Sequence, residues 1–263
     1  MDISLLNYTP QLYYYPFHTE EDKRKVLKAV PEQVGSCVLF KTDKEFFLTT
    51  TKHTFDNIQA SDIIIFLNGD NIIHLPNDTG FNISTKQLDN IDILIVKLPF
   101  DIVEKLSTRY FFLDYKYIDF NHNFDSVKSY RLLGFINRQT DLKNNKFSAT
   151  PFEFRTTTKH YKKIDTLGFN YFENIILKYN RRKQSYLLDN TISFGPKDLK
   201  GLSGGGIWYC QQDLQRPHLN FCFLVGVMIQ ERTNRGIVIG TKIKFIIDIL
   251  HHRFGVPIKI SQA

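Results

Sequence analysis

A serine set among glycines is the residue of this 263-residue chain whose surroundings best suit covalent chemistry. Ser203 lies two positions after Gly201 and directly before three glycines, residues 204–206. Glycines leave room for a carbonyl group to approach the hydroxyl, and their flexible backbone lets amide N–H groups turn toward one oxygen position. The loop therefore suits a nucleophile with an oxyanion hole beside it.

A second kind of serine loop has the same spacing. In α/β-hydrolases the Gly-x-Ser-x-Gly string leads from a strand into a helix, on a chain that alternates strands with helices. Here residues 207–210, Ile-Trp-Tyr-Cys, follow the glycines and favour a strand, and the chain lacks that alternation. The hydrolase elbow is thus the poorer interpretation of residues 201–205.

The serine also needs a base, because its hydroxyl is a weak nucleophile at neutral pH. His53 comes just after an apolar and threonine-rich run, residues 46–51, which places the ring at a strand end. Asp92 immediately precedes the apolar run 93–96, where it would hold the imidazole in the correct tautomer. Each residue alone is common at surfaces and turns, so the prediction of a His53, Asp92, Ser203 triad depends on all three together.

The elements that would position these side chains are short runs rich in β-branched and aromatic residues. Strands are expected at 36–40, 46–51, 63–67, 93–98, 130–135, 147–154, 221–229 and 237–239. Many short strands predict an all-β sandwich or a pair of barrels.

Two helices are expected outside these strands. Residues 19–30 begin with an N-cap and an acidic first turn, and residues 241–254 carry apolar side chains at steps of three and four. Thr241 would cap the second helix and Gly255 would end it. The expected parts are an N-terminal extension (1–33), a first β-barrel (34–120), a second β-barrel (121–240), and a C-terminal helix with its tail (241–263).

The composition is that of an ordinary globular protein. Hydrophobic residues make up 42% and charged residues 23%, which excludes a disordered or collagen-like chain. No apolar run approaches the roughly 18–20 residues that cross a bilayer. The first four residues also lack the basic start of a secretion signal. We therefore expect a cytosolic (cytoplasmic) protein with no membrane contact.

Cys37, Cys210 and Cys222 are an odd number of cysteines without a Cys-x-x-Cys spacing, which argues against a zinc site and a disulfide framework. Cys210 and Cys222 could face each other across a hairpin, but we expect two reduced thiols in the core. The pair His251 and His252 has no glutamate at metal-ligand spacing. The chain is expected to need no metal and no cofactor.

Three strings, in the order of the triad, resemble the trypsin-like serine peptidases of the chymotrypsin fold. Phe-Leu-Thr-Thr-Thr-Lys-His at 47–53 is similar to the family's Leu-Thr-Ala-Ala-His, and residues 91–98 are similar to Asp-Ile-Ala-Val-Leu-Lys-Leu. Gly-Leu-Ser-Gly-Gly at 201–205 is similar to Gly-Asp-Ser-Gly-Gly. The apolar strand 223–227 follows as in that family, and the resemblance covers about residues 34–250.

The resemblance implies an all-β protein of two antiparallel six-stranded β-barrels, with a C-terminal amphipathic helix. His53 and Asp92 would lie on the first barrel and Ser203 on the second, with the cleft between them. The amides of Gly201 and Ser203 would form the oxyanion hole. The implied activity is that of a serine endopeptidase: Ser203 attacks a peptide carbonyl, His53 carries the proton, and water hydrolyses the acyl-enzyme.

Two departures point to one branch of the family. Leu202 stands where secreted members carry the aspartate that pairs with a new N-terminus after zymogen cleavage, and the paired cysteines of those enzymes are missing. The chain is therefore more similar to the intracellular or bacterial type, in which packing or a regulatory protein partner sets the oxyanion loop. We expect a protein or peptide substrate and restricted specificity.

The substrate pocket is only outlined by the resemblance. In the family its base lies about six residues before the nucleophile, which implies Lys197 or Asp198 here, and its opposite wall corresponds to Ile229, Gln230 and Glu231. A lysine at the base would favour an acidic substrate residue, and an aspartate would favour a basic one. Both alternatives stay open.

A binding module without catalysis is the alternative function. The net charge is +7, and basic residues mix with aromatic ones at 159–163 and 178–183. Such stretches can bind nucleic acid or an acidic peptide, although solvated loops explain them as well. An intact triad favours the enzyme over a catalytically silent peptidase-like module, so nucleic acid is the less favoured partner.

Overall fold

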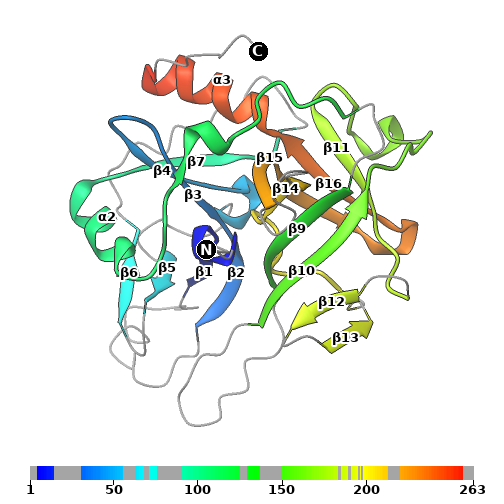
Figure 1. Ribbon diagram of the computed structural model, residues 1–263, viewed down its shortest axis with the longest axis horizontal. Coiled ribbons are helices and arrows are strands. Elements are labelled where there is room, and N and C mark those ends of the chain that lie inside the picture. Colours follow the sequence, from blue (N-terminus) through cyan, green and yellow to red (C-terminus); the bar gives the residue numbers. More distant parts are fainter. Residues whose placement is uncertain are drawn as a thin grey trace.

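The computed structural model describes residues 5–14, 31–55, 63–67, 71–75, 91–124, 129–136, 150–182, 185–188, 191–194, 196, 198–212 and 220–256. Strands dominate the secondary structure and are divided between two β-rich halves of the chain (Figure 1). The helix expected at 19–30 and the pocket residue Lys197 lie outside the described residues.

The first half consists of two four-stranded sheets, in the orders β2-β1-β5-β6 and β7-β4-β3-β8. Their strands are β1 (Gln11–Tyr14), β2 (Glu32–Ser36), β3 (Val38–Lys41), β4 (Phe46–Thr50), β5 (Ile63–Phe66), β6 (Ile72–His74), β7 (Leu94–Leu98) and β8 (Leu113–Asp114). Only Cys37 separates β2 from β3, so one stretch of chain passes from the first sheet into the second. The first barrel is therefore made of two linked sheets rather than one six-stranded sheet.

Both faces of the second sheet are buried. Leu39 and Leu48 pack in the interior of the first half, whereas Phe40 and Phe47 belong to a separate cluster that includes the C-terminal helix. Successive side chains of a strand point to opposite faces. The continuously apolar run in these strands thus serves two cores at once.

The second half is a six-stranded sheet in the order β10-β9-β14-β15-β16-β11. Its strands are β9 (Ser129–Ile136), β10 (Thr150–Thr157), β11 (Asn174–Lys178), β14 (Gly206–Gln212), β15 (Asn220–Arg232) and β16 (Ile237–Lys242), and β12 (Ser185–Leu188) and β13 (Thr191–Phe194) form a separate hairpin. The sheet curls until its two edges meet, through a bridge between Thr158 and Leu177. This closed sheet confirms the expected second six-stranded barrel.

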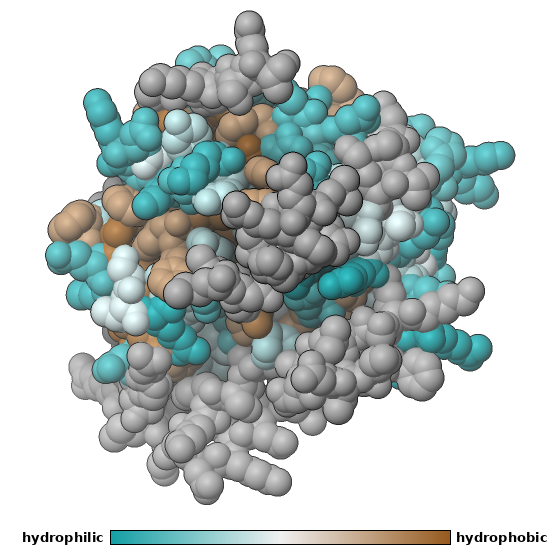
Figure 2. Space-filling view, viewed as in Figure 1, coloured by the Kyte–Doolittle hydropathy of each residue, from teal (hydrophilic) through white to brown (hydrophobic). Residues whose placement is uncertain are grey.

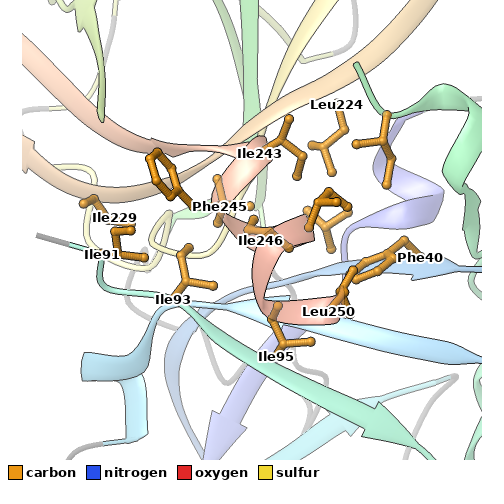
Figure 3. Close-up of a cluster of buried hydrophobic side chains, with 14 of the residues drawn as sticks. Phe40, Ile91, Ile93, Ile95, Leu224, Ile229, Ile243, Phe245, Ile246 and Leu250 are labelled. Atoms are coloured by element: carbon orange, nitrogen blue, oxygen red, sulfur yellow. The ribbon is translucent and has the colours of Figure 1, made fainter. Parts of the chain in front are cut away.

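The C-terminal helix α3 (Ile243–Phe254) covers the junction of the two halves. Figure 3 shows Ile243, Ile246 and Leu250 of this helix beside Ile95 of the first half and Leu224 of the second. Apolar area removed from water stabilises by about 25 cal/mol per Å². The apolar stripe predicted for the helix therefore joins the two halves through a shared core.

The structure corrects one detail of this helix and adds a second helix. Thr241 does not cap α3, because it is a buried residue of β16, whereas Gly255 ends the helix with φ 63° as expected. Helix α2 (Phe100–Ser107) follows β7 and was missed, since its apolar stripe spans only two turns. Neither helix of the described residues has the length and apolar character needed to span a bilayer.

The cysteines also require a correction. Cys210 and Cys222 are joined by a disulfide, so the expectation of two reduced thiols is wrong. The two residues lie directly opposite each other on β14 and β15, with their Cα atoms 4.0 Å apart. Residues opposed in this way on antiparallel strands lie within disulfide reach. Cys37 is a buried free thiol, and burial raises its pKa.

The other expected strands are confirmed by the structure at or near the expected positions, and the strand expected at 147–154 begins at residue 150 among the described residues. The all-β class with a C-terminal helix is also confirmed.

Candidate active site

Two neighbouring strands bring His53 and Asp92 together. β4 and β7 are antiparallel partners, with Thr50 opposite Leu94. His53 lies three residues beyond the end of β4 and Asp92 two residues before the start of β7, so both fall at the same edge of the sheet. The two side chains hydrogen-bond through His53 Nδ1 and Asp92 Oδ2, and the His53 amide donates to Asp92 Oδ1 at 3.0 Å.

The local turn presents the imidazole to solvent. His53 lies in a 3-10 turn, Lys52–Phe55, which is closed by a hydrogen bond of 2.7 Å between the hydroxyls of Thr51 and Thr54. The His53 side chain is 46% exposed and that of Asp92 is 29% exposed. Since Asp92 holds Nδ1, this arrangement fixes the ring and directs its chemistry to Nε2.

Ser203 lies on a loop whose other residues are enclosed. Between 201 and 208 it is the one residue that keeps partial exposure, and its neighbours Leu202 and Gly204 are buried. Gly201 and Gly204 have φ values of 92° and 86°, a region that favours glycine. The loop therefore presents a serine on an otherwise packed turn, as a nucleophile requires.

Two amides of this loop differ from the other four. Those of Lys200, Leu202, Gly204 and Gly205 donate to Asp198 Oδ1, Leu199 O, Met228 O and Leu202 O respectively. Within the described part of the chain, the amides of Gly201 and Ser203 donate to no protein acceptor. These are the two amides that the resemblance assigns to an oxyanion hole, and they remain available to an outside oxygen.

The serine loop meets the turn of His53 across Gly35 of β2. A Cβ atom at Gly35 would lie 3.0 Å from Ser203 O and 3.2 Å from Thr54 Oγ1. The amide of Ser36 donates to Ser203 O at 2.7 Å. The structure thus brings the loop of the second half to the strand that borders the His53 turn.

Ser36 and Gln33 contact the serine loop but were not found from the sequence. Both donate side-chain hydrogen bonds to the carbonyl of Gly201, at 2.9 and 3.3 Å. They lie 165 and 168 positions away from it in the chain, and no local pattern marks such a pair.

The outlined pocket residues lie in different surroundings. Glu231 accepts from the amide of Leu199 at 2.6 Å, and burial, followed by a hydrogen bond with Asp198, raises the pKa of Glu231 to about 7. Gln230 is half-buried. Ile229 is buried in the core beside Ile91 (Figure 3). The assignment of these residues to a substrate pocket stays a prediction.

Comparisons with known proteins bear on the fold. No family model matches the chain, and no curated protein matches it in sequence. Among solved structures, an inactivated protease paralogue of the scabies mite has a TM-score of 0.53 at 15% identity, over 96% of this chain and 98% of that one. Granzyme C has a TM-score of 0.56 at 11% identity, over 97% of both chains. The chain therefore has the two-barrel, chymotrypsin-like fold of the trypsin-like serine proteases.

Proposed function

We propose that this protein is a serine endopeptidase that hydrolyses peptide bonds through an acyl-enzyme. Ser203 Oγ attacks the peptide carbonyl, and His53 Nε2 takes the proton and returns it to the leaving amine. Asp92 holds the imidazole through Nδ1 and stabilises its positive charge. The developing oxyanion is bound by the amides of Gly201 and Ser203.

One observation carries this proposal: the amides of Gly201 and of the half-exposed Ser203 itself donate to no acceptor among the described residues, while the amide of Leu202 between them is paired. Amides that donate to no protein acceptor can bind an oxygen of a substrate, which is what an oxyanion hole requires. The hydrogen bond between His53 and Asp92, built from separate strands, is the second support.

The proposed substrate is a protein or peptide, and activity is restricted by the pocket or by a regulatory protein partner. The cytosolic location stays a prediction, and the bond between Cys210 and Cys222 argues against it. Disulfides are rare in reducing compartments. The assignment to the intracellular or bacterial type also stays a prediction, since that type was inferred in part from missing paired cysteines.

The test is covalent labelling with a fluorophosphonate probe, read by intact mass and peptide mapping. We expect one adduct, on Ser203, in the wild-type protein and none in Ser203→Ala. Ser107→Ala is a matched control, since the Ser107 hydroxyl donates to Val103 O within α2. Absence of an adduct in folded wild-type protein, or an adduct on another serine, would overturn the proposal.

The alternative, a catalytically silent binding module, is favoured by one surface. Basic side chains from the start of α3 and from the turn between β15 and β16 meet aromatic side chains of the segment after β10. Lys244 Nζ lies 3.9 Å from the ring centre of Phe172, which is 67% exposed, and Arg235 Nη1 donates to the Tyr161 hydroxyl at 2.9 Å. Figure 2 shows hydrophilic side chains projecting at the right edge of the molecule, the side of β11. Such a surface could hold a single-stranded nucleic acid.

Binding of a fluorescent single-stranded oligonucleotide, measured by anisotropy with Ser203→Ala protein, tests this alternative. A nucleic-acid module would bind with an affinity that falls steeply with salt. Phe172→Ala combined with Lys244→Ala would then weaken binding. Lys97→Ala would not, because Lys97 lies on β7 of the first half, where it pairs with Glu45. Salt-dependent binding together with no fluorophosphonate adduct would favour the module over the enzyme.

A further inference from the structure

We infer that Ser36 and Gln33 are positioning residues that keep the loop of Gly201 and Ser203 in its working shape. They hold this loop from the first barrel, through hydrogen bonds that involve no chain terminus. This inference rests on the proposed serine-peptidase function and concerns how its oxyanion hole is held.

Ser36 is bonded to the loop and to the second barrel through its side chain and its backbone. Its Oγ donates to Gly201 O at 2.9 Å and accepts from the amide of Phe135 at 2.9 Å. Its amide donates to Ser203 O, and its carbonyl accepts from Thr50 Oγ1 at 2.7 Å. The residue is fully buried. A buried serine with all its polar groups paired to fixed partners acts as a rigid support.

Gln33 adds a second donor to the same carbonyl. Its Nε2 donates to Gly201 O at 3.3 Å and to Phe135 O at 3.1 Å. Gly201 O therefore accepts two side-chain hydrogen bonds from β2. Each neutral hydrogen bond of this kind is modest alone, but two on one oxygen resist rotation of its peptide group.

The peptide that Ser36 and Gln33 hold lies between the two unpaired amides, and a further hydrogen bond fixes the direction of the second. Leu202 N donates to Leu199 O at 3.0 Å, so the peptide that carries Gly201 O is held at both ends. Leu202 O accepts from Gly205 N at 2.9 Å. A trans peptide places its carbonyl and its N–H on opposite sides, so this bond also fixes the direction of the Ser203 N–H.

Apolar packing and one carboxyl group complete the support. Leu202, which stands where an aspartate would pair with a new N-terminus, is fully buried in the cluster of Leu199, Val225 and Met228. Glu231 accepts from the Leu199 amide. The loop is thus held by β2, β15 and its own turns, and the aspartate and terminal amine of an activated zymogen have no counterpart among these contacts.

The contacts also leave little room for another arrangement. A Cβ atom at Gly204 would lie 1.8 Å from Ser36 O, and one at Gly134 would lie 2.7 Å from Leu202 Cδ1 and 2.9 Å from Ser36 Oγ. Contacts below 3.0 Å are not tolerated without a shift of the neighbours. The glycines are required here because the backbones of the two halves approach so closely.

The test measures fluorophosphonate inactivation of the full chain as two constants, the maximal rate kinact and the half-saturating concentration KI. We expect Ser36→Ala and Gln33→Met each to lower kinact by about 10- to 100-fold and to leave KI within about twofold. Loss of a whole oxyanion donor costs about 10²- to 10³-fold, and loss of its support should cost less. Thr156→Val is the matched control, because its buried hydroxyl donates to Lys178 O inside the second barrel.

The outcomes separate this inference from the function on which it rests. If wild-type protein forms no adduct on Ser203, the proposed function fails. If wild type reacts and folded Ser36→Ala or Gln33→Met reacts at the wild-type kinact, the positioning role fails. The positioning role would also fail if Ser36→Ala, Gln33→Met and Thr156→Val all lost the same thermal stability and the same fraction of kinact. The two variants test the same carbonyl, so misfolding of one leaves the other as the test.

Discussion

His53 and His122 each hydrogen-bond an aspartate through Nδ1, but their rings lie in different surroundings. The His53 side chain is 46% exposed, whereas that of His122, which pairs with Asp119 at 2.8 Å, is 1% exposed. His122 Nε2 lies 3.1 Å from the Tyr130 hydroxyl. The first pair stands at a strand end, and the second lies inside a cluster of aromatic rings with Phe124.

A histidine–aspartate hydrogen bond is therefore not by itself a sign of catalysis. Burial raises the pKa of Tyr130, so its hydroxyl keeps its proton at neutral pH and can donate to His122 Nε2. Both ring nitrogens of His122 are then satisfied inside the protein, where its side chain is almost fully buried. A base needs one nitrogen within reach of the reacting group, and in the proposed enzyme the exposed ring of His53 would meet that need.

Substitution of the two histidines should separate them by activity, and by the widest margin. We expect His53→Gln to lower the rate of Ser203 labelling by about 10⁶-fold, the scale of removing the base of a serine triad. His122→Gln should change the labelling rate by less than about threefold and lower the melting temperature instead, because it disturbs a buried hydrogen-bonded group. Rate measurements on folded protein at one temperature check both. A large rate loss in folded His122→Gln would erase the distinction.

Substitution of the two aspartates should change the labelling rate in the same order as substitution of the histidines, by a smaller factor. Asp92→Asn keeps the shape of the pair but stabilises the wrong tautomer of His53, and we expect a rate loss of about 10⁴-fold. Asp119→Asn should leave the labelling rate near that of wild type. The measurement is the rate of fluorophosphonate labelling, with circular dichroism to show that both variants are folded. Near-normal labelling in Asp92→Asn would mean that another group orients His53.

The parts of the site that could be predicted are those whose signal is local. His53 and Asp92 each adjoin an apolar strand run, and Ser203 carries its glycines beside it, so their types and neighbours mark them as candidates. The same runs of β-branched and aromatic residues predict the all-β class, because such residues suit pleated, buried surfaces.

The parts that could not be predicted depend on register and on distant contacts. Cys210 faces Cys222 only because the pairing of β14 and β15 shifts at a bulge between Ile207 and Trp208. A one-residue slip changes every pairing beyond it, and no rule reads such a bulge from one sequence. Ser36 contacts Gly201 only when the two halves are packed together, and a contact between residues 165 positions apart leaves no local pattern in the sequence.

A carboxyl group with an acidic partner extends the comparison, and it should show the smallest effect. Asp92 and Asp119 pair with imidazoles, whereas Glu231 is hydrogen-bonded to Asp198. Burial and this partner raise the pKa of Glu231 from 4.5 to about 7 in the folded protein. Between these values the folded protein binds a proton that the unfolded chain has released. The contribution of Glu231 to stability is therefore present below pH 4.5 and is lost as the pH rises toward 7.

Glu231→Gln isolates this contribution, because its amide oxygen can still accept from the Leu199 amide and its amide group can donate to Asp198. Between pH 5 and pH 7.5, the melting temperature of Glu231→Gln should fall by about 2–5 °C less than that of wild type. Equal falls in melting temperature in wild type and Glu231→Gln would mean that Glu231 is already ionised at pH 5 in the folded protein. The acidic partner would then not govern its protonation.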